Sequence, residues 1–264
     1  MSGTWHYGLI ARWWAEVNRP EPVELDSLRA AIRRFGEPAL DLGCGTGRLL
    51  LPLLAEGLDV DGTDISADML DRAREAAAAA GIDIDGRLTV QPFDGLERSR
   101  PYATIFSIGS FAIGGSRQRD EAALRRLHDS LLPGGVLILS YEVVPDEVHA
   151  RLADPARTYP SPWPETGMRA TMADGDELEL FSRAAAYDAS TRTHDLEIRA
   201  RLWRDGELLR EEAGSLGNTY YPPDALAGML RDARFTGIRV EGPYTGRPAA
   251  PADETVVAVA RRVS

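Results

Sequence analysis

The sequence contains no lysine and only one cysteine, Cys44. All 30 basic residues are therefore arginines, and the 41 acidic residues outnumber them to give a net charge of −11. Because a phosphate backbone attracts clustered positive charge, this balance argues against DNA or RNA as a partner and favours a small neutral or cationic molecule. A lone cysteine excludes an internal disulfide and agrees with a reducing compartment, so we expect a cytoplasmic protein.

Long hydrophobic runs are also absent. No apolar stretch approaches the roughly 20 residues that a membrane span needs, and the N-terminus lacks the pattern of a secretory signal, so we expect no membrane partner. No group of His, Asp and Glu has the spacing of metal ligands, so we expect no metal site. The chain has 264 residues, 44% of them hydrophobic and 27% charged, which is typical of a globular protein with a large core.

Strands and helices alternate along most of the chain. Helices are expected over residues 5–18, 22–35, 67–80, 118–132 and 222–233, and strands at the start of the glycine-rich segment and over 58–63, 87–91, 102–108 and 135–143. This alternation predicts an α/β fold with a doubly wound, Rossmann-like, mostly parallel seven-stranded sheet. The last two strands, in IRVEGP and ETVVAVARR, are expected to close one sheet edge as an antiparallel pair.

The pattern changes after residue 144. Residues 145–166 are rich in proline, and four strand-like segments follow between residues 167 and 219. Asp174-Gly175 and Asp205-Gly206 are two-residue hairpin signals. We therefore expect an N-terminal helical lid over 1–36, a core over 37–144 and 220–264, and a small antiparallel sheet inserted over 145–219. That sheet would either cap the pocket or pair with a second subunit, so both a monomer and a homodimer remain open.

The most informative segment is Asp41-Leu42-Gly43-Cys44-Gly45-Thr46-Gly47. A dinucleotide-binding turn reads G-x-G-x-x-G, but the third glycine position is occupied by Arg48. A Walker A loop requires Gly-Lys-Ser/Thr, which a chain without lysine cannot contain. The remaining reading is a G-x-G-x-G turn, with an acid two residues before it, that brings backbone close to a ligand without cradling phosphates.

Three motifs occur in order between residues 39 and 143: ALDLGCGTGRLLLPLLAEG, VDGTDISADMLDRARE and a Pro-Gly-Gly before a strand. Their order and spacing resemble class I S-adenosylmethionine-dependent methyltransferases. The strand-rich insertion resembles the small-molecule branch of that family, which includes amino-sugar N-methyltransferases. The resemblance implies S-adenosylmethionine as cofactor and methyl transfer to a small natural-product acceptor, either an amino sugar or an aromatic, indole-like or phenolic compound. Whether carbon, nitrogen or oxygen is methylated stays open.

The resemblance also implies roles for residues near the cofactor. Gly43, Gly45 and Gly47 would let the backbone approach its methionine and ribose parts. Asp41 would reach its ammonium group, and Asp64, at the end of the second strand, would accept both ribose hydroxyls.

The adenine would pack on apolar side chains, with one acid at its amino group. Ile65, Met69 and Phe93 would contact the ring faces, and Asp94 would accept from the amino group. The fifth motif lacks its usual acid, because Tyr102-Ala103-Thr104 stands in its place. Ser107 and Ile108 would offer backbone atoms to the methionine part.

The acceptor would meet the cofactor at the carboxyl ends of the strands. Tyr7 and Glu142 are the candidate catalytic residues, Glu142 as a base or an ammonium-binding group. The expected walls of the substrate pocket are Trp13, Trp14, Tyr141 and Tyr221. Alternatives remain open: one face of the N-terminal helix packing on the core, Glu142 as a solvated strand-end carboxylate, and the whole chain as a non-catalytic relative that binds the cofactor.

Overall fold

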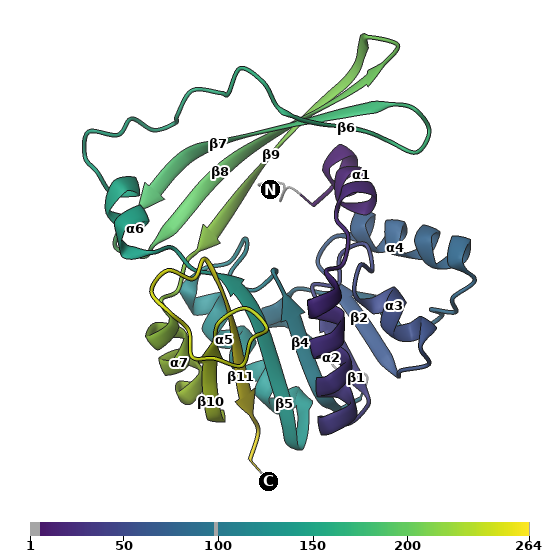
Figure 1. The fold of residues 1–264 in the computed structure, drawn as a ribbon, viewed down its shortest axis with the longest axis vertical. Helices are drawn as coiled ribbons and strands as arrows, with labels where there is room; N and C mark the ends of the chain where they lie inside the picture. The colour runs from purple at the N-terminus through teal and green to yellow at the C-terminus, as the bar shows by residue number, and fades with distance from the viewer. Residues whose placement is uncertain (1–5, 98–99, 264) are drawn as a thin grey trace.

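The computed structural model describes residues 6–97 and 100–263. Seven strands form one sheet in the order β10-β11-β5-β4-β1-β2-β3 (Figure 1). Their bounds are β1 Ala39–Leu42, β2 Val60–Asp64, β3 Leu88–Val90, β4 Tyr102–Ile108, β5 Leu131–Glu142, β10 Thr236–Glu241 and β11 Thr255–Arg261. The first five strands are parallel, whereas β11 pairs antiparallel with both β5 and β10. The expected Rossmann-like, mostly parallel seven-stranded sheet is confirmed.

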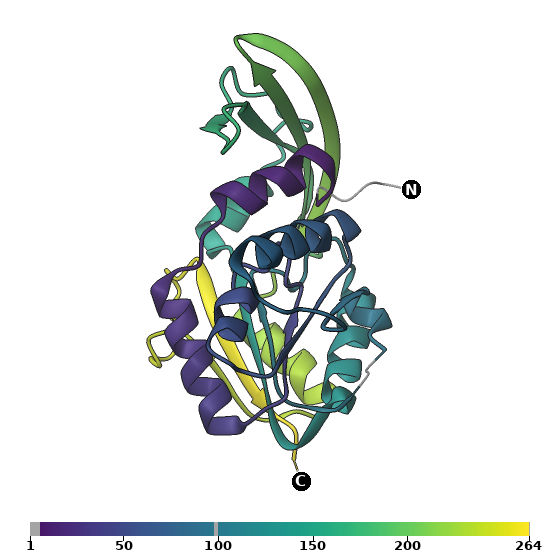
Figure 2. The same ribbon diagram turned by 90° about the vertical axis from the view of Figure 1, so that its right-hand side faces the viewer.

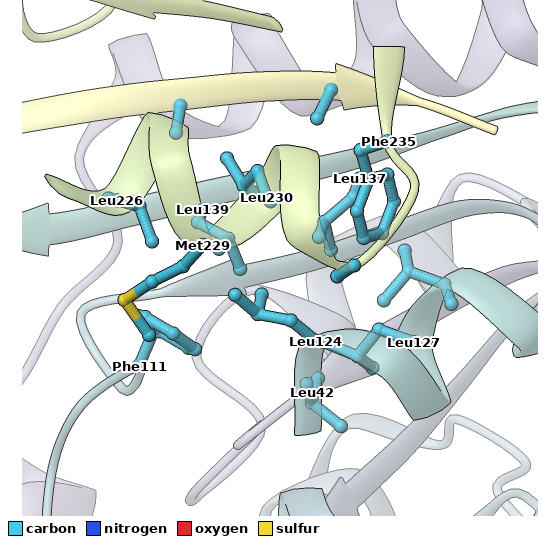
Figure 3. Packing of buried hydrophobic residues seen from close by; sticks show 14 of the residues in the cluster. Leu42, Phe111, Leu124, Leu127, Leu137, Leu139, Leu226, Met229, Leu230 and Phe235 are labelled. Carbon is cyan, nitrogen blue, oxygen red and sulfur yellow. The ribbon is translucent and has the colours of Figure 1, made fainter. Parts of the chain in front are cut away.

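Helices cover both faces of this sheet, and alternate residues of its strands point to opposite layers. On one face, α5 (Arg117–Ser130) and α7 (Pro223–Asp232) pack on β1, β4, β5 and β11 (Figure 3). On the other face lie α2 (Pro22–Phe35), α3 (Leu50–Ala55) and Leu70 of α4 (Ala67–Ala80). In β11, Val256 and Ala258 join the first layer, and Val257 joins the second. The two layers fix the strand ends in space and so define where a ligand can bind.

The α4 helix begins and ends where its sequence signals place it. The Ser66 side chain accepts a hydrogen bond from the Met69 N–H at 3.2 Å, which is the expected N-cap contact. Gly81 follows the last turn in the left-handed conformation that glycine adopts without strain. This N-cap places Asp64 and Ile65 directly before the helix, at the end of β2.

A second sheet lies beyond the carboxyl ends of the parallel strands (Figures 1 and 2). It is antiparallel, in the order β6-β7-β8-β9, with bounds β6 Met168–Thr171, β7 Glu177–Asp188, β8 Thr193–Arg204 and β9 Glu207–Thr219. A short helix, α6 (Asp146–Leu152), and the proline-rich segment connect it to β5. The expected small antiparallel sheet between β5 and α7 is therefore present.

The N-terminal helix α1 (Gly8–Val17) lies between the inserted sheet and α4 (Figure 2). Its apolar side, with Leu9, Ile10 and Trp13, packs against the inserted sheet rather than on the core sheet. At its start, the Gly8 N–H donates to Asp68 Oδ2 of α4 at 2.7 Å. The helix is thus held from below by α4 and from above by the inserted sheet.

Several local expectations differ from the structure. The helix expected over 5–18 begins at Gly8, and residues 1–5 of the expected N-terminal lid lie outside the described residues. The Pro-Gly-Gly segment at 133–135 lies inside β5, at a register shift against β4, instead of preceding the strand. Asp205-Gly206 forms the expected two-residue turn, since Arg204 pairs with Glu207. At Asp174-Gly175 the loop is longer, because the Met172 N–H bonds to the Asp176 carbonyl across it.

Candidate functional site

A cavity of about 340 Å³ lies at the carboxyl ends of the parallel strands, beneath the inserted sheet. Its volume falls within the range of small-molecule pockets. The glycine loop and the end of β2 form one end of its wall, the segment after β4 and the start of α5 form a side, and β8, β9 and α1 contribute the rest. Of the expected site residues, ten line it: Trp14, Asp41, Gly43, Gly45, Asp64, Ile65, Met69, Phe93, Asp94 and Glu142.

The glycine loop brings bare backbone to the cavity wall. Gly43 and Gly45 have φ values of 75° and 54°, in the left-handed region that favours glycine. A Cβ on Gly43 would lie 2.6 Å from Ser110 Cβ, whereas a Cβ on Gly45 would meet no atom within 4 Å. Gly45 therefore faces open space in the cavity, where a side chain would occupy room that a ligand could use.

Gly47 serves packing instead. It does not line the cavity, and a Cβ there would lie 2.9 Å from Leu51 Cγ. Its φ of 80° also favours glycine. The third glycine of the motif thus lets the loop turn into α3 and contacts no part of the cavity.

Asp64 is held rigidly at the end of β2. The Gly45 N–H donates to its Oδ2 at 2.9 Å, and the Ser66 N–H donates to its Oδ1 at 2.8 Å. Burial raises the pKa of this carboxyl, and the two backbone N–H groups oppose the rise. Because each carboxylate oxygen can accept more than one hydrogen bond, Asp64 can still accept two hydroxyl groups from a ligand.

Asp41 is the most unusual acid of the site. It is buried at the end of β1, and among the described residues its Oδ2 has no hydrogen-bond partner. Burial raises the pKa of Asp41 to about 8, with nearby Arg48 acting in the opposite direction. Arg48 is itself paired with Glu24 of α2. An unsatisfied buried acceptor costs about 1–3 kcal/mol, so the carboxyl of Asp41 is set to receive a donor from a ligand.

Apolar side chains form the wall next to Asp64. Met69 is buried, Phe93 is half-buried, and Ile65 is 40% exposed with its side chain on the cavity. Asp94 lies beside them, but its two oxygens accept from Arg119 Nε at 2.8 Å and Nη2 at 3.0 Å. The Arg119 guanidinium lowers the pKa of Asp94, so this acid enters the site as part of an ion pair.

The opposite end of the cavity is formed by Glu142 and by the end of β9. Asn218 Nδ2 donates to Glu142 Oε2 at 3.4 Å, and Tyr220 completes this wall. The segment after β4 is hydrogen-bonded to the same part of β9, since the Gly114 N–H donates to the Gly217 carbonyl at 2.6 Å. The inserted sheet and the core thus share one continuous wall of the cavity.

Four of the expected aromatic residues lie outside the cavity. Tyr7 is 39% exposed and donates from its hydroxyl to the Ile65 carbonyl at 3.2 Å. Trp13 is buried against the inserted sheet, and only its neighbour Trp14 faces the cavity. Tyr141 and Tyr221 are buried in the core layer of α5 and α7, because their side chains point away from the cavity.

Ser107 is likewise buried within β4 and does not reach the cavity. The residues that follow it, Ile108, Gly109 and Ser110, line the wall in its place. In the sequence, the signal that points to these residues as cavity lining is their position at or directly after the end of a strand.

Two functional candidates carried no recognisable motif. Asp120 of α5 lines the cavity and accepts from the Tyr221 hydroxyl at 2.7 Å. Burial raises the pKa of Asp120 to about 6, against the effect of that hydrogen bond. Asn218 is the other, and nothing in its sequence neighbourhood indicates a contact with Glu142.

Residues 6–97 and 100–263 contain no group of three or more His, Cys, Asp and Glu side chains arranged to hold a metal ion. Within the same residues, no helix is long and apolar enough to cross a bilayer.

Comparison with known families agrees with this geometry. Residues 40–137 match the family model described as a methyltransferase domain. This segment contains the glycine loop, Asp64 and most of the parallel strands. The match therefore falls on the segment whose motifs resemble those of methyltransferases.

Among individual relatives, a ubiquinone biosynthesis O-methyltransferase of Erwinia tasmaniensis is 37% identical over 84 residues, covering 29% of this chain and 35% of that protein. One from Xanthomonas campestris pv. campestris is 30% identical over 145 residues, covering 50% of this chain and 56% of that protein. The matches thus span between about a third and just over half of these relatives' length.

Solved structures match over nearly the whole chain. An S-adenosylmethionine-dependent methyltransferase from Clostridium acetobutylicum has a TM-score of 0.74 and 16% identity, with 97% of this chain and 98% of that chain covered. The methyltransferase CcbJ from Streptomyces caelestis has a TM-score of 0.70 and 19% identity, with 99% of both chains covered. A sugar N-methyltransferase from Streptoalloteichus has a TM-score of 0.69 and 16% identity, covering 100% and 94%. At these identities the likeness concerns the fold, including the inserted sheet.

Proposed function

We propose that this protein is an S-adenosylmethionine-dependent methyltransferase that acts on a small-molecule acceptor. The observation that carries the proposal is the pair of acids at the glycine loop. Asp64 is fixed by two backbone N–H groups with capacity left for a ligand's hydroxyls, and Asp41 holds a buried oxygen without a partner among the described residues. A ribose with two hydroxyls and an ammonium group would satisfy both.

The other residues of this end fit the same cofactor. Gly45 faces open space, so a ligand can lie against backbone, and Ile65, Met69 and Phe93 offer apolar contact for an adenine ring. When bound, S-adenosylmethionine supplies an electrophilic methyl carbon on a sulfonium. The protein's own part is to position the acceptor and exclude water, because the leaving group needs no acid assistance.

The inserted sheet and α1 together supply the cover of the cavity in this proposal. The side of the cavity that faces away from the core is lined by Leu196 and Leu216 of the inserted sheet. Trp14 of α1 and Asn18, directly after α1, line the same side. We therefore assign residues 145–219 to a cap over the acceptor, with α1 as a second covering element. Pairing with another copy through the same sheet remains the alternative.

The acceptor is an amino sugar or an aromatic, indole-like or phenolic compound in this proposal. The overall likeness to a sugar N-methyltransferase supports the first class, and Trp14 in the cavity wall is compatible with a ring of either kind. Natural-product metabolism is the setting that these relatives suggest.

The function is tested by calorimetric titration with S-adenosylhomocysteine and by transfer of label from methyl-labelled S-adenosylmethionine to pools of nucleotide-linked amino sugars and of indoles and phenols. Asp64→Asn keeps the shape of the side chain but weakens its hydrogen bonding to ribose, so affinity should fall by at least about tenfold. Asp71→Asn is a matched control on the adjacent helix, exposed and outside the cavity lining. Binding without label transfer to any pool would favour the non-catalytic relative, and absence of binding would refute the proposal.

A further inference from the structure

Acidic side chains outnumber basic ones in the cavity wall. Five acidic residues line the cavity, Asp41, Asp64, Asp94, Asp120 and Glu142, against two arginines. Both guanidinium groups are occupied: Arg48 pairs with Glu24, and Arg119 pairs with Asp94. Among the described residues, no arginine that lines the cavity is therefore left to neutralise a carboxylate at its other end.

Glu142 is the carboxylate at that other end, on β5, which β4 separates from β1 and its glycine loop. It is the last residue of β5, and alternation along the strand turns it toward the cavity while Tyr141 enters the core. Among the described residues Glu142 forms no ion pair, and its one side-chain hydrogen bond, from Asn218, is long at 3.4 Å. Its other oxygen, Oε1, is left for a ligand.

The surroundings of Glu142 increase the gain from a cation. Although its side chain is exposed on one side, burial of the remainder and the nearby Glu254 both raise the pKa of Glu142. Arg192, whose guanidinium donates to the Val144 carbonyl two residues beyond Glu142, is paired with Asp146. A carboxylate that is partly withdrawn from water and faces a second acid is stabilised by a positively charged partner.

We infer that Glu142 selects an amine as the methyl acceptor, with Asn218 as the residue that positions its carboxylate. This inference rests on the proposed function, because it takes the glycine-loop end of the cavity for the cofactor. The amine binds as an ammonium ion against Oε1. Tyr220 and the apolar residues Leu196 and Leu216 contact the rest of the molecule.

The chemistry of transfer balances with these groups. The ammonium loses one proton to the Glu142 carboxylate, and the nitrogen lone pair then forms the new N–C bond. The carbon–sulfur bond of the sulfonium breaks and leaves its electron pair on sulfur. The proton passes from Glu142 to water at the exposed side of the carboxyl group.

Asn218 can orient the Glu142 carboxylate because its own backbone is held against the segment after β4. Its backbone forms a bridge with Ile113 in the segment after β4, and the adjacent Thr219 N–H donates to the Ala112 carbonyl at 3.0 Å. Its side chain reaches Glu142 from this fixed point. The carboxylate is thereby oriented from the inserted sheet, although Glu142 itself belongs to the core.

The test compares two probes that differ in one group, cyclohexylamine and cyclohexanol, by ligand-observed NMR titration of the protein saturated with S-adenosylhomocysteine. We expect the amine to bind at least about tenfold more tightly than the alcohol, as a partly desolvated charge pair allows. Glu142→Gln should reduce that preference to less than about threefold and leave S-adenosylhomocysteine affinity unchanged. Glu147→Gln removes the same charge from an exposed residue of α6 outside the cavity lining and should keep the preference.

Asn218→Ala provides a separate readout of positioning: it should weaken amine binding without changing the affinity for cyclohexanol. Equal binding of the two probes to the wild-type protein, or an unchanged preference in Glu142→Gln, would overturn the inference. Failure to bind S-adenosylhomocysteine would instead refute the proposed function. In that case, comparing the two probes on the protein without S-adenosylhomocysteine would still show whether Glu142 prefers an amine.

Discussion

Proton release on cofactor binding is the sharpest consequence of the buried acid at the end of β1. With its pKa raised to about 8, Asp41 is mostly protonated at neutral pH in the free protein. An ammonium group beside its unpartnered oxygen favours the ionised form, so binding lowers the pKa of Asp41 and displaces its proton. Affinity must therefore rise with pH up to the pKa of the free protein and level off above it.

The magnitude follows from the ionised fraction of Asp41 in the free protein. For a group that titrates near pH 8, that fraction is about 3% at pH 6.5 and about 75% at pH 8.5. If the bound form stays ionised throughout, the association constant rises about 25-fold across this interval, or about 1.9 kcal/mol. At pH 7 each molecule of ligand bound should release close to one proton, roughly 0.9.

Isothermal titration calorimetry with S-adenosylhomocysteine measures both quantities. Titrations in two buffers of different ionisation enthalpy give the number of protons released, and a pH series gives the slope. Asp120 has a pKa of about 6 and His6 of about 4, so both change charge mainly below the interval. Asp41→Asn carries no titrating group and should bind with a nearly flat pH profile. A wild-type affinity that is constant between pH 6.5 and 8.5, with no proton released, would refute the reasoning.

Two further predictions concern stability. Tyr221→Phe removes the hydroxyl that donates to Asp120 at 2.7 Å, and loss of this buried hydrogen bond should lower the free energy of unfolding by about 1–3 kcal/mol, measured by urea denaturation; a loss below measurement error would contradict a bonding role. Gly47→Ala should destabilise the fold more than Gly81→Ala, because both positions have a positive φ but only at Gly47 would the new Cβ crowd Leu51, at 2.9 Å. Equal losses of about 1 kcal/mol each would show that backbone strain alone matters at both sites.

The regular elements followed from local signals. The N-cap at Ser66, the glycine at Gly81 and the two-residue turn at Asp205-Gly206 act over a few residues, so their physics is contained in the sequence. The alternation of strands and helices likewise predicts the parallel sheet. The carboxyl ends of its strands are where Asp41 and Asp64 meet the cavity.

Two of the wrong site predictions, Trp13 and Tyr221, have the same cause: in each case the adjacent residue faces the cavity instead. Trp14 faces the cavity and Trp13 the inserted sheet; Tyr220 lines the wall, whereas Tyr221 enters the core. A one-residue step along a strand or helix turns a side chain to another face, and composition does not say which face meets the ligand.

Other contacts depend on elements that lie far apart in sequence. Asp94 was expected to face a ligand's amino group, but α5 brings Arg119 to it over 25 residues. Asn218 reaches Glu142 over 76 residues, through the path of β9. Neither contact has a local signature, since each exists only once the sheets and helices are packed.

The hydrogen-bonded seam between β9 and the segment after β4 limits how this protein can be recombined with its relatives. Gly114 and Ala112 bond to the end of β9, while neighbouring residues of the same segment line the glycine-loop side of the cavity. If residues 145–219 alone were exchanged for those of a relative, a foreign β9 would lie against the native segment after β4. The hydrogen bonds between them would then depend on two sequences that do not belong together. A chimera intended to change acceptor preference should therefore take residues 109–115 and the inserted sheet from the same parent protein.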